Sequence, residues 1–218
     1  APNDPNAQGR KKHAGDAIFE DVNNDGQLDS KDMKFMGYIR PDKVGGIVNS
    51  FKYKGLTVRV VMDWAMGHVI DNGFKGQIMG SSRNNNNAIK DAMTNSWQSA
   101  NDGTKYPKYT VQSDYDYQYR NHMRWDNQIG SSESGSTNNS LYFSKGDYLA
   151  FREVSLSYML PSTWVRKIRL SGVEVFAGAY NIGYIKKYDG MFPEIYTGVD
   201  YGVYPRPRQY NMGVKINF

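Results

Sequence analysis

Residues 206–218 read RPRQYNMGVKINF, and every second residue from Tyr210 onward is apolar. Successive side chains of a strand point to opposite faces of a sheet, so this alternation predicts a β-strand with one apolar and one polar face. Chain ends in soluble domains usually fray, yet this pattern continues to the aromatic residue at position 218. The two predicted faces are Tyr210, Met212, Val214, Ile216 and Phe218 against Gln209, Asn211, Gly213, Lys215 and Asn217.

A hairpin is predicted further upstream. Residues 45–53 and 56–66 both alternate, and only Lys54 and Gly55 separate them. A two-residue connection between alternating runs indicates a tight β-turn, in which Gly supplies the positive φ.

Two more strands are predicted at residues 147–160 and 171–185. The first has a frame slip at Arg152-Glu153, which predicts a β-bulge. The five strands run about 9–15 residues, the length that a tilted strand needs to cross a bilayer.

The connections alternate between short and long. Two residues join the hairpin, about ten join the next pair of strands (161–170), and the others are the long stretches 67–146 and 186–204. Short turns on one side and long loops on the other are typical of outer-membrane barrels. Five strands cannot close a pore, so we expect an all-β chain that forms the C-terminal strands of a large antiparallel transmembrane β-barrel with long extracellular loops.

Composition excludes several other classes. The 218 residues contain no Cys, so disulfide and thiolate chemistry are excluded, and no window approaches the roughly 20 apolar residues of a membrane helix. The net charge of +5 comes from Lys and Arg spread along the chain, without the basic cluster expected of a nucleic-acid-binding protein. The chain lacks nucleophile-elbow, Walker A and dinucleotide motifs, and we predict that it is not an enzyme.

An acidic segment precedes the strands, and residues 1–44 as a whole are predicted to form an extracellular loop ahead of barrel residues 45–218. Its spacing fits a twelve-residue calcium loop with Gly26 at the sharp turn. The alternative is an Asx-rich turn whose polar groups satisfy one another. The predicted calcium ligands are Asp21, Asn23, Asp25, Gln27 through its carbonyl, Asp29 and Asp32.

The long loop 67–146 is rich in aromatic residues. A short helix is predicted near 88–98 from apolar residues at helical spacing after an Asn-rich N-cap. The aromatic side chains either form stacking platforms for a substrate or pack the loop against its neighbours. The candidate substrate-binding residues are Tyr115, Tyr117, Tyr119 and Trp125.

Several stretches resemble the C-terminal region of the SusC/RagA family of TonB-dependent importers from Bacteroidota. Residues 15–29 (GDAIFEDVNNDGQLD) are similar to the family's GD..(Y/F).DVNGDG.ID segment. Residues 148–161 (YLAFREVSLSYMLP) resemble YLRLKNLTLGYTLP, although Ala150 replaces the usual basic residue. Residues 204–218 resemble YP.PR.YTLGLNLTF, and the matches recur in family order.

The resemblance implies an outer-membrane barrel plugged by an N-terminal domain, driven by TonB and capped by a SusD-like lipoprotein. It implies uptake of glycan or peptide oligomers, with lipid around the barrel and the rest of the same barrel beside these strands. Two alternatives stay open: a secreted, calcium-stabilised carbohydrate-binding β module, and an adhesin-like structural β-protein. Only the barrel would require detergent for extraction.

Overall fold

The computed structural model describes residues 14–15, 20–26, 30–79, 89–109 and 140–218. No helix in this described part is long and apolar enough to cross a membrane. The chain divides into two compact units. The first comprises Ala1–Gly37, Ile70–Ser144 and Thr197–Gly202, and the second comprises Tyr38–Val69, Lys145–Tyr196 and Val203–Phe218.

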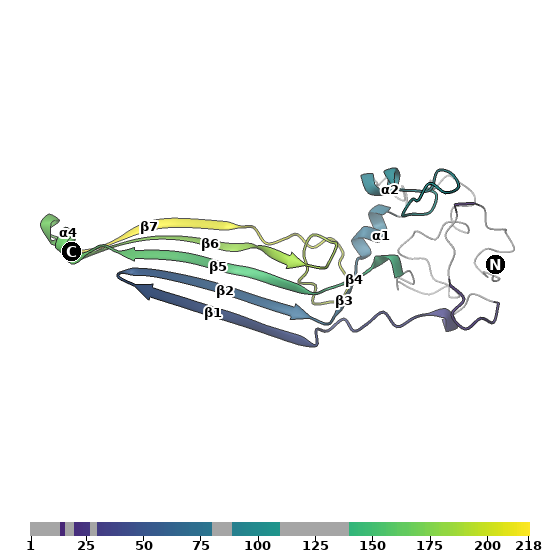
Figure 1. Cartoon of the computed structure of the whole chain (residues 1–218), viewed down its shortest axis with the longest axis horizontal. Coiled ribbons are helices and arrows are strands. Elements are labelled where there is room, and N and C mark those ends of the chain that lie inside the picture. Colours follow the sequence, from purple (N-terminus) through teal and green to yellow (C-terminus); the bar gives the residue numbers. More distant parts are fainter. Residues whose placement is uncertain (1–13, 16–19, 27–29, 80–88, 110–139) are drawn as a thin grey trace. The chain divides into compact units, whose positions relative to one another are not determined.

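The second unit is built on one five-stranded antiparallel sheet (Figure 1). Its strand order is β1-β2-β5-β6-β7, so neighbours in the sheet follow one another along the chain. The strands are 9 to 15 residues long, which confirms the predicted lengths. Their bounds are β1 Lys43–Tyr53, β2 Leu56–Met66, β5 Tyr148–Met159, β6 Gly172–Lys186 and β7 Gln209–Asn217.

The last strand begins later than predicted. The sequence pattern places its start at residue 206, but β7 starts at Gln209. Pro205 and Pro207 explain the difference, because proline has no N–H to donate to a ladder. A short helical connector separates β5 from β6, made of α4 Ser162–Val165 and the 3-10 turn η5 Arg166–Ile168.

The predicted hairpin is confirmed. Lys54 and Gly55 both have positive φ, 45° and 87°, as a two-residue turn of this hand requires. The turn also contacts the next strand, because the Met159 N–H donates to the Gly55 carbonyl at 2.9 Å.

The predicted bulge in β5 is also confirmed. Against β2, Val61 pairs with Glu153 while Met62 pairs with Phe151, so Arg152 is the extra residue. β6 is irregular at the same level, where Asn181 adopts a φ of 50°.

The first unit contains short elements around a small core. Ala92, Tyr106 and Tyr142 are buried together, and Ile89 and Leu141 pack against them. A separate two-stranded pairing joins β3 to β4. The elements are η2 Ser30–Asp32, β3 Val69–Asp71, α1 Gly73–Met79, α2 Lys90–Thr94, η4 Ser140–Tyr142 and β4 Phe143–Lys145.

The helix predicted near 88–98 is shorter than expected. Helix α2 spans only Lys90–Thr94, and the residue at its N-cap, Ile89, makes no side-chain capping bond. The helix ends because the chain beyond it pairs with another segment. The Tyr106 N–H donates to the Asn95 carbonyl at 3.0 Å, and the Trp97 N–H donates to the Tyr106 carbonyl at 2.9 Å.

Replacing Gly55 by Ala should destabilise the hairpin. A β-carbon at this position would lie 2.7 Å from the Met159 carbonyl oxygen, and the positive φ adds strain. The strain alone costs about 1–2 kcal/mol. Lys54→Asn is the matched control, because Asn tolerates positive φ. Urea unfolding of the intact protein in lipid vesicles should show a lower midpoint for Gly55→Ala alone. Equal midpoints for the two variants would contradict this account of the turn.

Candidate functional site

The sheet of the second unit has one apolar face. Cross-strand pairing places Phe51, Val58, Leu156, Ala177 and Met212 in one row across all five strands. Leu156 lies in the central strand, yet 47% of its surface is exposed, so the described residues leave this face uncovered there. Within the described strands the only charge on it is Lys43, at the start of β1.

The opposite face is polar. Its matching row runs from Ser50 through Arg59, Ser155 and Gly178 to Asn211. The face also carries ion pairs, and one of them joins Arg59 Nε to a Glu153 oxygen at 3.4 Å.

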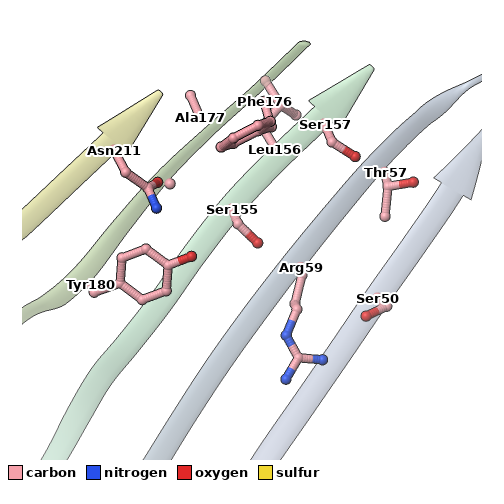
Figure 2. Close-up of a pocket in the computed structure, with 11 residues that line it drawn as sticks. Ser50, Thr57, Arg59, Ser155, Leu156, Ser157, Phe176, Ala177, Tyr180 and Asn211 are labelled. Atoms are coloured by element: carbon pink, nitrogen blue, oxygen red, sulfur yellow. The ribbon is translucent and has the colours of Figure 1, made fainter. Parts of the chain in front are cut away.

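A hollow lies on the polar face toward the hairpin turn, and Figure 2 shows its side chains on neighbouring strands. Glycines leave room for two of the side chains that line it, Asn211 and Phe176. A β-carbon on Gly178 would lie 2.6 Å from Asn211 Oδ1, and one on Gly213 would lie 2.6 Å from Phe176 Cζ. The hollow therefore offers hydroxyl, amide and guanidinium groups beside aromatic rings. Its polar and aromatic lining is Ser50, Thr57, Arg59, Ser155, Ser157, Phe176, Tyr180 and Asn211.

A buried carboxylate, Glu194, organises the other half of the polar face. Its side chain is 1% exposed. One oxygen lies 2.5 Å from Arg152 Nη1 and accepts a hydrogen bond from the Tyr184 hydroxyl at 2.6 Å. The other oxygen lies 3.2 Å from Arg206 Nη2. Two arginines and a tyrosine therefore neutralise and hold one carboxylate.

Arg152 connects this group to the sheet. Its Nη2 donates to Asp63 Oδ2 at 2.7 Å, and its Nε pairs with the second oxygen of the same carboxylate. Such bidentate pairs fix geometry as well as charge. Removing one partner from a buried pair costs about 3–5 kcal/mol, because the remaining charge is left uncompensated. We call Asp63, Arg152, Tyr184, Glu194 and Arg206 the Glu194 network.

Sequence reasoning missed the Glu194 network. Glu194 and Arg206 lie in an irregular loop, far in sequence from Asp63, and no periodicity points to them. The sequence feature that could have pointed to this network is Arg152, a charged residue at the predicted bulge. Bulges commonly re-aim a side chain.

The junction at the strand ends opposite the hairpin turn holds a buried histidine. His68 is 6% exposed, and burial lowers its pKa, opposed by the nearby Asp147 carboxylate. Asp147 accepts the Gly67 N–H at 2.8 Å and the Lys187 ammonium at 2.9 Å. These hydrogen bonds hold the pKa of Asp147 below its usual range, so the junction keeps a neutral imidazole beside a charged carboxylate.

The described part of the acidic segment forms an Asx-rich turn. Asp21 accepts the Asp25 N–H at 3.2 Å and the Gly26 N–H at 2.9 Å. Asp32 accepts the Val22 N–H at 2.9 Å. Among the described residues no three acidic, His or Cys side chains group as a metal site. Of the predicted ligands, Gln27 and Asp29 lie outside the described residues, so calcium binding stays a prediction.

The candidate substrate-binding aromatics Tyr115, Tyr117, Tyr119 and Trp125 also lie outside the described residues. Tyr106, from the same long loop, is described and is buried in the small core of the first unit. Its hydroxyl donates to Asp91 at 2.7 Å, so this aromatic residue packs the loop.

No family model matches the chain, but curated sequences do. TonB-dependent receptor P3 of Formosa agariphila is 25% identical over 216 residues, which cover 94% of this chain and 19% of that receptor. Receptor P39 of the same organism is 24% identical, with the same coverage of both chains. TonB-dependent receptor SusC of Bacteroides thetaiotaomicron is 26% identical over 91 residues, or 41% of this chain and 9% of that receptor.

Solved structures match as well. The RagAB peptide transporter matches with a TM-score of 0.63 at 21% identity, over 89% of this chain and 20% of that chain. Its closed-closed state gives a TM-score of 0.62. The five strands match part of the RagA barrel. The chain is a distant homologue of the SusC/RagA-type TonB-dependent receptors.

This homology has three consequences. Most of this chain aligns with these receptors, but it spans only about a fifth of their length. TonB-dependent receptors of the Bacteroidota reside in the outer membrane, as predicted for this chain. They are transporters, which confirms the prediction that the chain is not an enzyme.

The calcium prediction can be tested by titration. Calcium titrated calorimetrically into the intact receptor should occupy one more site in the parent than in Asp25→Ala, because the variant loses a central oxygen ligand. Asp102→Ala is the control, since Asp102 accepts backbone N–H groups of Gln98 and Ser99 in a different loop. Equal calcium stoichiometry in the parent and Asp25→Ala would contradict the calcium prediction and favour an Asx-rich turn whose polar groups satisfy one another.

Proposed function

We propose that this chain forms part of the wall of an outer-membrane TonB-dependent importer, with its apolar face toward lipid and its polar face toward the lumen. The apolar face of the sheet is the observation that supports this orientation most strongly. Leu156 in the central strand and Met212 in β7 both expose large apolar surfaces there. Membrane barrels alternate apolar side chains outward with polar side chains inward.

The secreted-module alternative accounts poorly for this face. Monomeric soluble proteins rarely leave a contiguous apolar surface of this extent in water. The row from Phe51 to Met212 spans every strand of the sheet, so the exposed surface is continuous and not a set of scattered residues. A lipid environment removes it from water.

The connections suggest an orientation across the membrane. The hairpin turn at 54–55 and the connector at 161–170 lie at one end of the antiparallel sheet, which we assign to the periplasm. The strand ends at Met66, Tyr148, Lys186 and Gln209 lie toward the opposite end, which we assign to the cell exterior. Short periplasmic turns and longer outer loops support this assignment.

Substrate and partners are inferred from similarity. One similar structure is named a RagAB peptide transporter, and one relative is SusC. We propose that the whole protein imports peptide or glycan oligomers with a SusD-like lipoprotein. TonB would act through a part of the protein outside this chain. Contact of Tyr115, Tyr117, Tyr119 and Trp125 with substrate remains a prediction.

An arginine placed on either face of β7 tests the orientation. Met212→Arg should destabilise the barrel by about 2–4 kcal/mol if the position lies near the bilayer midplane. Asn211→Arg is the matched control, because it introduces the same side chain one residue away on the polar face. Urea unfolding in lipid vesicles measures both variants. Equal losses, or a larger loss for Asn211→Arg, would contradict the proposed orientation.

A further inference from the structure

The connection that follows β6 is folded onto the polar face of its own sheet. Its buried run includes Phe192, Pro193, Glu194 and Ile195. The Phe192 ring meets the Tyr184 ring edge-on, with centroids 5.8 Å apart. We call residues 187–196 the strap, because they cover one end of the polar face.

Ion pairs at Glu194 join the strap to the sheet and to the segment that leads into β7. Glu194 of the strap pairs with the sheet arginine Arg152. Arg206, from the segment leading into β7, reaches the second oxygen of the same carboxylate. Contacts from both sides therefore converge on Glu194, and its side chain is almost fully buried.

The position of the strap depends strongly on the charge of Glu194, because this buried carboxylate pairs with two arginines. Apolar contacts such as Phe192 against Tyr184 tolerate small displacements, whereas hydrogen-bonded ion pairs require defined geometry. Without the negative charge, Arg152 would keep Asp63 as a partner, but the strap would lose its ion pairs with both arginines.

We infer that Glu194 is a positioning residue that fastens the strap over Asp63 and Arg152, so that this end of the polar face is closed while the hollow beyond Arg59 stays open. The importer wall then has two distinct inner surfaces. One is a fixed cover, and the other is the hydroxyl-lined hollow of Figure 2. The inference rests on the proposed function only for the statement that this face lines a lumen.

Cysteine labelling tests the strap. Ala150 lies on the polar face between Asp63 and Tyr184 in register, and it is 1% exposed. The chain has no native cysteine, so Ala150→Cys gives a single reporter within it. A water-soluble maleimide is added to the detergent-solubilised intact receptor, and any cysteines outside this chain are first replaced.

Glu194→Gln and Arg206→Met should each label Cys at position 150 at least about tenfold faster than the parent, because labelling follows the open population. Both substitutions leave the sheet side chains around position 150 in place. Glu153→Gln is the control, since it breaks the separate pair with Arg59, and it should label at the parent rate. Heat-dependent gel mobility confirms that each variant is a folded barrel.

Two results would overturn the inference. One is labelling in folded Glu194→Gln and Arg206→Met at the parent rate, and the other is equal acceleration in Glu153→Gln. Because the assay is run in detergent, its outcome does not depend on which face meets lipid. Failure of the proposed orientation would instead appear in the arginine substitutions of β7.

Discussion

A sheet that separates lipid from water must keep its register along every strand, because a slip of one residue moves all later side chains to the other face. In β5 the apolar residues change from odd positions, ending at Phe151, to even positions, starting at Val154. The bulge at Arg152 absorbs this change. It keeps the apolar face continuous from β2 through β5 to β6, and the fold depends on it.

The same bulge builds the polar side of the sheet. The extra residue is an arginine that reaches Asp63 on the neighbouring strand and Glu194 beyond the end of β6. Replacing a buried ion network by apolar groups is often neutral or stabilising, so such networks are weak evidence for net stability. The Glu194 network is better understood as a device that selects one position for an irregular segment. One backbone irregularity therefore serves both faces.

The regular parts of this structure follow from local rules. The alternation around Lys54-Gly55 and the frame slip at Arg152 each depend on neighbouring residues, and both predictions are confirmed. The predicted helix near 88–98 was too long, because pairing of the next residues with Tyr106 overrides helical spacing. Glu194 could not be predicted, since its partners come from distant strands and only the three-dimensional fold brings them together. The calcium ligands form a local pattern, yet whether they gather around an ion depends on backbone geometry that spacing alone does not fix.

The central claim is that adjacent residues of β5 face lipid and water in turn. Spin labels placed singly at Leu156 and Ser155 of the intact receptor in lipid vesicles test it most directly. Oxygen partitions into the bilayer, whereas a neutral nickel chelate stays in water, so relaxation by each agent reports the surroundings of the label. The account predicts that the label at 156 is relaxed more strongly by oxygen and the label at 155 by the nickel chelate. The reverse ranking, or nickel-dominated relaxation at both positions, would contradict it.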